Sequence, residues 1–336
     1  MNADIIAIVT ELIATPKKIV IVGHKNPDGD AIGSCLGLGL FLKAKGHEVQ
    51  VIMPNDFPQF LKWLPGCNEL IIHDKAVQES KTAILEADVI FTLDFNALNR
   101  SGDAAPFLES SDAQFVMIDH HQQPDDYAVV TYSDANMSST CEMVYHFIDG
   151  LGGLDLLSAE IATLLYTGIM TDTGSFRFPA TTPTTHKVAA HLIEAGAEHS
   201  RIHEKIYDTN SPDRMRLLGV ALKNLIILDD YKVAYISLSQ EELDANNFRK
   251  GDTEGFVNYA LSVQGINFAI IFIENKQENI VKISFRSKGG FSVNEFAITH
   301  FNGGGHTNAA GGRSSKGLAD TISEFISILP DYKTQI

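Results

Sequence analysis

Aspartate and histidine residues gather in one short segment near the start of the chain. His24, Asp28 and Asp30 fall within seven residues, directly after a run rich in β-branched residues. Pro27 and Gly29 predict a turn here rather than a continuing strand or helix. Such a turn would aim all three polar side chains at one point above the edge of a sheet.

Three further segments place acids or imidazoles where an apolar element ends. Asp94 closes one apolar run, the sequence Asp119-His120-His121 closes another, and Asp172 ends a helix-like stretch. A single aspartate at a turn is most often a turn former, but four such segments in one chain favour a shared site. Carboxylates that converge without counter-charge repel one another, and divalent cations relieve that repulsion.

The ligand types favour Mn²⁺ or Fe²⁺ over Ca²⁺ or a thiolate-bound zinc, because carboxylates are mixed with imidazoles. The chain offers enough ligands for two metal ions that share one carboxylate. That arrangement activates a water molecule and clamps a transferring phosphoryl group. The sequence therefore predicts a two-metal centre that acts on phosphate esters.

A glycine-rich segment near the C-terminus predicts contacts with an anion. Glycines let backbone N–H groups approach an anion closely, and the planar guanidinium of an arginine matches a phosphate. A flexible loop and a solvated arginine are the plain alternatives. The residues expected to bind substrate here are Arg286, Ser287, Gly304, Gly305, His306 and Asn308.

Strand-like and helix-like stretches alternate along the first half of the chain. The expected strands are Lys18–Val22, Glu48–Met53, Asp88–Asp94 and Gln114–Asp119, and the expected helices are Ala31–Lys45, Ser138–Asp149 and Ser158–Met170. This alternation predicts an α/β fold with a mainly parallel sheet flanked by helices. In such sheets ligands bind at the carboxyl ends of the strands.

The pattern changes after residue 185. A mostly helical segment is followed by strand-like runs at Lys232–Leu238, Asn267–Glu274 and Asn279–Arg286. We predict a larger metal-binding catalytic domain at 1–185, a helical connector at 186–229 and a smaller α/β substrate-binding domain at 230–336. The active site is expected in the cleft between the domains.

Composition narrows the class of protein. The chain has 336 residues, of which 44% are hydrophobic and 20% charged, as in soluble globular proteins. Its three cysteines form no C-x-x-C pair, and no apolar run is long enough to cross a membrane. The N-terminus lacks the features of a signal peptide, so a cytoplasmic protein is expected. A net charge of −16 disfavours long duplex nucleic acid as a partner.

The four segments together resemble the DHH phosphoesterase superfamily, named for the motif present here as Asp119-His120-His121. The run from His24 to Ser34 is similar to its first motif, Leu93-Asp94 with Asn99-Arg100 to its second, and the run from Thr171 to Phe176 to its fourth. The glycine-rich segment resembles the C-terminal domain of the nucleic-acid-directed members.

The resemblance implies a role for each residue. One metal ion would be held by His24, Asp28 and Asp94, and the other by Asp30, Asp94, His120 and Asp172, so that Asp94 bridges them. The implied catalytic residues are His121, Asp94 and Asp119. His121 would face the substrate phosphate as hydrogen-bond donor or general acid, and Asp119 would orient a ligand without binding metal. Arg100 joins the residues expected to bind substrate.

The resemblance also implies an activity. The chain is similar to the bifunctional group that degrades short oligoribonucleotides to mononucleotides and converts 3′-phosphoadenosine-5′-phosphate (pAp) to AMP. Two Mn²⁺ ions are the expected cofactors, with Mg²⁺ or Fe²⁺ as alternatives. The alternative functions are a pyrophosphatase or exopolyphosphatase, a phosphodiesterase for the linear dinucleotide pApA, and a non-enzymatic nucleotide sensor. A homodimer is compatible with the sequence, which leaves the oligomeric state open.

Overall fold

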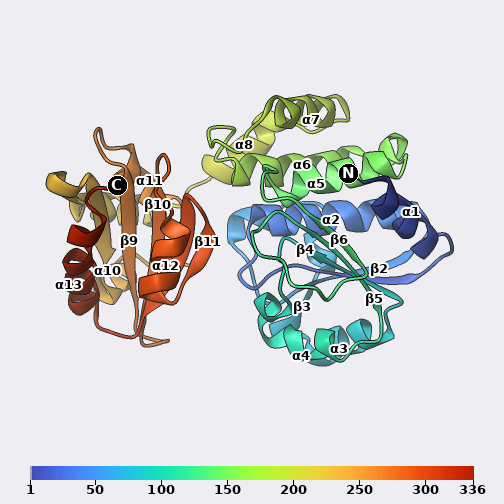
Figure 1. Ribbon diagram of the computed structural model, residues 1–336, viewed down its shortest axis with the longest axis horizontal. Coiled ribbons are helices and arrows are strands. Elements are labelled where there is room, and N and C mark those ends of the chain that lie inside the picture. The colour runs from blue at the N-terminus through green and yellow to red at the C-terminus, as the bar shows by residue number, and fades with distance from the viewer. Residues whose placement is uncertain (1) are drawn as a thin grey trace. The chain divides into compact units, whose positions relative to one another are not determined.

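The computed structural model describes residues 2–336, and the chain forms two compact units. The first unit ends at Thr209 and the second spans Asn210–Ile336. Each unit has its own sheet of six strands (Figure 1). No helix among the described residues is long and apolar enough to cross a membrane.

The sheet of the first unit is entirely parallel, with the strand order β3-β2-β1-β4-β5-β6. Its strands are β1 (Lys18–Val22), β2 (Glu48–Met53), β3 (Ile71–Ile72), β4 (Val89–Leu93), β5 (Gln114–Asp119) and β6 (Val130–Ser133). The four predicted strands are confirmed, whereas the short strands β3 and β6 were not foreseen. The chain order reverses between β1 and β4, and in sheets of this kind a ligand crevice opens there at the carboxyl ends.

Helices cover both faces of this sheet (Figure 1). One face carries α2 (Gly29–Ala44), α5 (Thr140–Gly150) and α6 (Ala159–Asp172), and the other carries α3 (Val77–Glu86) and α4 (Ala105–Glu109). The strands are apolar on both sides because both faces of a parallel sheet are buried. Ile21 and Phe91 belong to the core under α2, whereas Val20 and Ile90 belong to the core under α3. Near the N-terminus, α1 (Ala3–Leu12) contributes Val9 to the core under α2.

Glycines let α2, α5 and α6 pack closely. A Cβ at Gly33 of α2 would lie 2.5 Å from the carbonyl oxygen of Leu164 on α6, and a Cβ at Gly168 of α6 would lie 2.1 Å from Cys141 Sγ on α5. Side chains at these positions would push the helices apart. The Cβ built at Gly168 also lies 2.8 Å from Asp30 Oδ1, so the close packing brings the start of α2 against α6.

The sheet of the second unit has the order β11-β12-β10-β9-β8-β7 and is antiparallel except between β8 and β9. Its strands are β7 (Ile226–Leu228), β8 (Val233–Leu238), β9 (Phe268–Asn275), β10 (Ile280–Ser287), β11 (Gly304–His306) and β12 (Ala309–Ser314). Its helices are α9 (Pro212–Lys223), α10 (Gln240–Ala245), α11 (Phe256–Ser262), α12 (Val293–Phe301) and α13 (Leu318–Ile328). A phenylalanine-rich core lies under α12 and α13, and a second core lies under α9 and α11.

The segment 186–229 does not form a separate connector in the structure. Helices α7 (Pro183–Glu194) and α8 (His199–Tyr207) belong to the first unit, and α9 belongs to the second. The physical reason is that each helix has an apolar face to bury. Val188 and Leu192 of α7 join the core of the first unit, whereas Leu217 and Leu218 of α9 join a core of the second.

Candidate active site

The carboxyl ends of three neighbouring strands bring the predicted ligands of the first unit together. His24 lies just beyond β1, Asp94 directly follows β4 and His120 directly follows β5. These strands are adjacent in the order β1-β4-β5. The ligands therefore lie at the point where the strand order reverses, as the general rule for such sheets predicts.

The first cluster consists of His24, Asp28 and Asp94, whose potential ligand atoms lie within 4.8 Å of one another. His24 Nε2 is 3.3 Å from Asp94 Oδ2 and 3.9 Å from Asp28 Oδ1. His24 Nδ1 lies 2.9 Å from the carbonyl oxygen of Lys25. A hydrogen bond donated there leaves Nε2 as the ring nitrogen that faces the carboxylates.

The second cluster is centred on His120. Its Nε2 is 3.7 Å from Asp30, 3.6 Å from Asp94 and 3.5 Å from Asp172. Its Nδ1 faces the carbonyl oxygen of Met137 at 3.2 Å, so Nε2 again faces the acids. Asp94 takes part in both clusters, because its Oδ2 faces His24 and its Oδ1 faces His120. This geometry fits the bridging role predicted for Asp94.

A third pair adjoins these clusters. Asp119 is fully buried, and its Oδ1 lies 2.7 Å from His121 Nδ1. Its Oδ2 accepts a hydrogen bond of 3.0 Å from the backbone N–H of His121. Asp119 therefore fixes the ring of His121 through its Nδ1 atom. His121 Nδ1 is also 3.7 Å from Asp94 Oδ1, which ties the pair to the clusters.

The electrostatics of the clusters call for positive charge at their centre. Burial lowers the pKa of His24, but the hydrogen bond to Asp94 and the charge of Asp28 outweigh it and raise that pKa to about 9. Burial likewise lowers the pKa of His120, and the charges of Asp172 and Asp30 raise it to about 9. Burial, together with the charges of Asp94 and Asp172, raises the pKa of Asp30 well above its usual range. The acids thus favour the protonated, positively charged form of both imidazoles. Divalent cations bound between the same groups would supply that positive charge instead.

The loop between β1 and α2 differs from the predicted turn. Asp28 caps α2, with its Oδ1 accepting hydrogen bonds from the backbone of Asp30 and Ala31 at 3.0 and 3.1 Å. Gly29 and Asp30 therefore form the first turn of α2 rather than part of a turn before it, because aspartate is a favoured N-cap residue. The side chain of Asp28 stays half exposed beside the first cluster.

Asn55, which the sequence analysis missed, fixes this loop from the end of β2. Its side-chain oxygen accepts a hydrogen bond of 2.6 Å from the backbone of Asn26, and its amide donates to the Asn26 side chain at 3.1 Å. Asn26 needs this support because its φ is +60°, in the left-handed region. The available signal was position alone, since Asn55 follows the carboxyl end of a strand next to β1.

Asp94 itself has a strained backbone. Its φ is +64°, a conformation that costs a non-glycine residue about 1–3 kcal/mol. Its backbone N–H donates to the carbonyl oxygen of Ile118 at 3.1 Å, which holds the turn after β4. Strain of this kind persists where the surrounding structure enforces it, and it concentrates at functional sites.

The beginning of α5 also reaches the clusters. The backbone N–H groups of Thr140 and Cys141 donate to the two carboxylate oxygens of Asp30, and the Thr140 hydroxyl donates to Asp94. Neither residue was predicted, because neither side chain carries a charge to draw attention. Arg100 lies beside the loop between β1 and α2, where its carbonyl oxygen accepts a hydrogen bond of 2.8 Å from the backbone of Lys25.

The glycine-rich segment of the second unit forms strands rather than a loop. Gly304–His306 and Ala309–Ser314 pair as antiparallel strands β11 and β12. A Cβ at Gly305 would lie 2.5 Å from the carbonyl oxygen of Ala309, so this glycine permits the close approach of the two strands. Gly304 has no such restriction and is exposed, which leaves it accessible to a ligand.

Arg286 and His306 share one face of this sheet. Ala309 of β12 pairs directly with Arg286 of β10 on one side and with His306 of β11 on the other. Residues that pair directly across strands point to the same face, so the two larger side chains flank the small Ala309. The row Arg286-Ala309-His306 is therefore a cradle with a basic group on either side.

Ser287 and Asn308 have a different position from these two residues. The Ser287 hydroxyl is buried and donates to the carbonyl oxygen of Phe291 at 2.7 Å. It accepts a hydrogen bond of 2.8 Å from the Asn308 amide, which also donates to the carbonyl oxygen of Gly289 at 3.0 Å. These contacts brace the loop beside the cradle.

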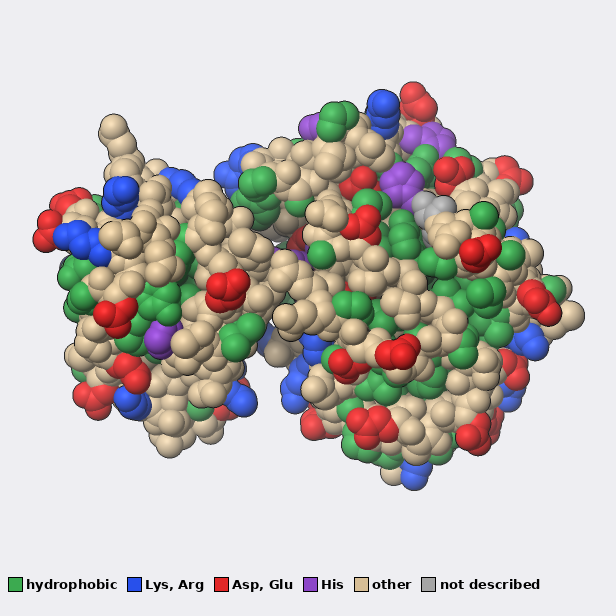
Figure 2. Space-filling view, viewed as in Figure 1, with side chains coloured by type: hydrophobic (Ala, Val, Ile, Leu, Met, Phe, Trp, Pro, Cys, Tyr) green, Lys and Arg blue, Asp and Glu red, His purple; other side chains and the backbone are tan. Residues whose placement is uncertain are grey.

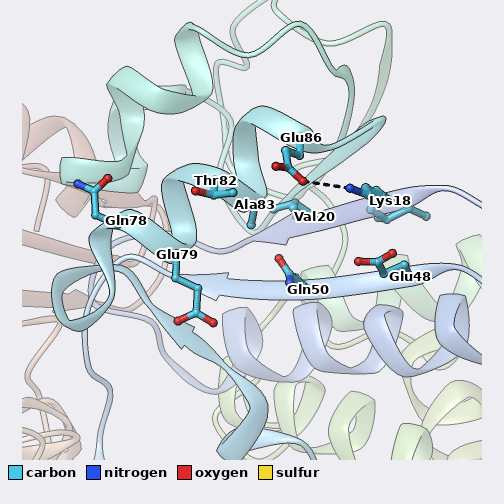
Figure 3. Close-up of a pocket in the computed structure, with 10 residues that line it drawn as sticks. Lys18, Val20, Glu48, Gln50, Gln78, Glu79, Thr82, Ala83 and Glu86 are labelled. Atoms are coloured by element: carbon cyan, nitrogen blue, oxygen red, sulfur yellow. Dashed lines mark hydrogen bonds and ion pairs between the residues drawn. The ribbon is translucent and has the colours of Figure 1, made fainter.

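A groove elsewhere on the first unit is lined by other residues than the predicted ligands. It lies over the beginnings of β1 and β2, at the opposite edge of the sheet from the clusters (Figure 3). It is lined by Glu48, Glu79 and Glu86, and its Lys18 is paired with Glu86 at 3.0 Å. Acidic side chains are spread over the visible face of each unit (Figure 2). None of the predicted ligands lines this groove.

Comparison with known proteins gives consistent similarities. Residues 18–169 match the DHH family, N-terminal domain, and residues 230–332 match the DHHA1 domain. A bifunctional oligoribonuclease and PAP phosphatase NrnA from Thermus thermophilus is 33% identical, over 91% of this chain and 87% of its own length. The crystal structure of an exopolyphosphatase-related protein from Bacteroides fragilis has a TM-score of 0.96 and 40% identity, covering 99% of this chain and 98% of that one.

RecJ from Thermus thermophilus, crystallised with Mn²⁺, is a more distant neighbour. Its TM-score is 0.54 at 14% identity, and the match covers 99% of this chain and 55% of RecJ. At this level of identity the likeness concerns the fold alone.

Proposed function

Since this chain belongs to the DHH family of phosphoesterases and is therefore a hydrolase, we propose that it cleaves short oligoribonucleotides to mononucleotides and pAp to AMP. We propose two Mn²⁺ ions as its cofactors, with Mg²⁺ or Fe²⁺ as alternatives, and the cytoplasm as its location. The observation that carries the proposal is the placement of Asp94, whose two oxygens face two separate ligand clusters. The similarity to an NrnA along most of both chains supports the choice of substrate.

The donor set fits two divalent cations. His24, Asp28 and Asp94 would hold one ion, and Asp30, Asp94, His120 and Asp172 the other, all through oxygen or imidazole nitrogen. Such ligands suit Mn²⁺, and RecJ has been crystallised with Mn²⁺ on a related fold. When bound, a pair of divalent cations supplies an activated water and charge stabilisation for phosphoryl transfer.

In the proposed reaction Asp119 orients His121, and His121 acts on the substrate. Asp119 holds the imidazole through Nδ1 and through the backbone of His121. The Nε2 atom of His121 is then the one that donates a hydrogen bond to the substrate phosphate, or a proton to the leaving oxygen. We propose that Arg100, whose carbonyl oxygen accepts a hydrogen bond from Lys25, adds positive charge beside the loop between β1 and α2.

We propose that the second unit binds the far phosphate of the substrate. The side chains of Arg286 and His306 and the backbone of Gly304 and Gly305 would make the contacts, and Ser287 and Asn308 would hold the adjoining loop in place. Ala309 leaves room for a phosphate between the two basic groups. That the substrate lies in a cleft between the two domains stays a prediction.

A phosphoanhydride hydrolase is the second candidate, because the similar Bacteroides fragilis structure is described as exopolyphosphatase-related. The phosphodiesterase acting on pApA is the third. One assay separates the three. The purified Mn²⁺-loaded protein is incubated with pAp, a 5′-phosphorylated RNA dinucleotide, pApA, long RNA, pyrophosphate and polyphosphate, and initial rates are compared.

We expect pAp and the RNA dinucleotide to be the best substrates and long RNA to be a poor one. Asp94→Ala should reduce hydrolysis to background. Asp112→Ala removes an exposed carboxylate at the other edge of the sheet, just before β5, and should leave the rates unchanged. Faster turnover of pyrophosphate or polyphosphate than of pAp would contradict the proposed substrate class, and an active Asp94→Ala variant would contradict the metal site.

The cradle in the second unit has its own test. Ala309→Leu should fill the space between Arg286 and His306 and raise KM for pAp without changing Mn²⁺ binding by the first unit. Arg286→Lys keeps the charge but loses the planar fork, so it should raise KM as well. An unchanged KM in both variants would show that the second unit binds its phosphate elsewhere.

A further inference from the structure

We propose that Thr140, in the first turn of α5, is a positioning residue. It would set the orientation of the carboxylates of Asp30 and Asp94, two of the proposed metal ligands. The inference rests on the metal site proposed above. Thr140 lies outside the sequence motifs described above. It would act through a neutral hydroxyl and a backbone N–H rather than as a ligand of the metal.

Asp30 is 1% exposed and lies in one cluster with Asp172 and His120. Such a carboxylate needs donors that leave room for a cation. The backbone N–H of Thr140 donates to Asp30 Oδ2 at 2.7 Å, and that of Cys141 donates to Oδ1 at 2.9 Å. One fixed donor on each oxygen leaves the other lone pair of each oxygen for metal. The helix N-terminus also places partial positive charge beside the acid.

The Thr140 side chain acts on the second carboxylate. Its hydroxyl donates to Asp94 Oδ1 at 3.0 Å. This is the oxygen that lies 3.6 Å from His120 Nε2, whereas Oδ2 lies 3.3 Å from His24 Nε2. The hydrogen bond therefore opposes rotation of the carboxylate and keeps one oxygen facing each cluster. A lysine in place of Thr140 would also hold the oxygen, but its charge would repel a cation.

The surrounding contacts make the start of α5 a rigid support. Ser139 caps the helix and accepts a hydrogen bond of 3.0 Å from the backbone of Glu142. The buried Glu142 carboxylate accepts hydrogen bonds from Ser138 and from Thr185, the latter at 2.9 Å. Thr140 itself is fully buried. Its hydroxyl is therefore held by the fold rather than chosen from several rotamers in solvent.

The inference predicts a specific defect in metal binding. Loss of a group that orients a ligand typically weakens metal affinity about 10–100-fold. Thr140→Val, which keeps the shape and the backbone N–H but removes the hydroxyl, should weaken binding by that factor. The ion held by Asp30, His120 and Asp172 should be affected more strongly, because the hydroxyl contacts the oxygen that faces this cluster.

Mn²⁺ binding is measured by electron paramagnetic resonance of the free ion during titration, without substrate. Thr140→Ser keeps the hydroxyl but loses the methyl group, and it should bind Mn²⁺ within a few-fold of the original protein. If Thr140 acted only by packing its methyl group, Thr140→Ser would be the weaker binder and Thr140→Val the normal one. Thr140→Ala is a second hydroxyl-free variant in case Thr140→Val does not fold. Fluorescence of the single tryptophan, Trp63, reports folding of the first unit.

Thr321→Val is the matched control. Thr321 is equally buried and also donates its hydroxyl to a buried side chain, but that side chain is Ser314 of the second unit, which is not a proposed ligand. It should leave Mn²⁺ affinity unchanged. Wild-type affinity for two ions in both hydroxyl-free variants would overturn the inference. If Asp94→Ala also binds two ions normally, the proposed metal site itself is wrong.

Discussion

Replacement of Gly168 by alanine tests whether close helix packing forms the site. The added Cβ would lie 2.1 Å from Cys141 Sγ and 2.8 Å from Asp30 Oδ1. Real Cβ atoms are essentially never found within 3.0 Å of a neighbour, so α5 or α6 must shift. Overpacking of this kind costs about 1–3 kcal/mol, and alanine returns about 1 kcal/mol through its higher helix propensity. Because a contact of 2.1 Å lies at the severe end of this range, we expect the free energy of unfolding to fall by about 2 kcal/mol.

The assay is urea unfolding followed by Trp63 fluorescence, which reports the first unit, and by far-ultraviolet circular dichroism, which reports both. A matched control is Gly219→Ala on α9, an exposed helical glycine where an added Cβ meets no atom within 4 Å. That change should stabilise the second unit by up to about 1 kcal/mol and leave the Trp63 transition unchanged.

Two results would refute the reasoning about Gly168. The first is a Trp63 transition in Gly168→Ala at the same urea concentration as in the original protein, or higher. The second concerns the double variant Gly168→Ala with Cys141→Ala, in which the new Cβ can occupy the space of the removed sulfur. If the double variant is no more stable than the sum of the single changes predicts, the contact with Cys141 is not the cause.

Three further predictions follow from the same contacts. Asn55→Ala removes the hydrogen bonds that hold the left-handed Asn26 and should lower the free energy of unfolding by about 1–3 kcal/mol, measured by urea unfolding. Burial raises the pKa of Glu142, but hydrogen bonds from His146, Ser138 and Thr185 outweigh it and hold that pKa below the ordinary value of 4.5. The stability that Glu142 adds over Glu142→Gln should therefore be fully present above about pH 4.5 and be lost as the pH falls below it, as unfolding at a series of pH values can show. Addition of Mn²⁺ at about 100 times its dissociation constant should stabilise the first unit by about 2.7 kcal/mol, an effect that EDTA removes and that Asp94→Ala lacks.

Each of these predictions has an outcome that would contradict it. Unchanged stability of Asn55→Ala would mean that Asn26 holds its conformation without the pair. A stability difference for Glu142→Gln that persists below the depressed pKa would show that packing rather than charge explains the residue. Equal stabilisation of the original protein and Asp94→Ala by Mn²⁺ would place the ion outside the proposed clusters.

Much of the first unit could be predicted because its signals are local. Apolar runs such as 19–22 of β1 are buried on both faces of a parallel sheet, and the polar residue that follows such a run must leave the core. The carboxyl ends of parallel strands lie at one edge, so His24, Asp94 and His120 were expected together, and the structure places them together. The aspartates and histidines at these strand ends also indicated oxygen and imidazole ligands for a metal ion.

The tertiary structure alone decided the contacts between distant parts of the chain. Thr140 and Asp30 are separated by 110 positions, and no pattern in either segment indicates their hydrogen bond. The same holds for Asn55 and Asn26, and for the close approach of Gly168 to Cys141. The glycine-rich segment became strands because β12 pairs with β10, a partner that the local sequence does not specify. Hydrophobic patterning and residue type act within an element, whereas the orientation of a carboxylate depends on whichever donors the fold brings beside it.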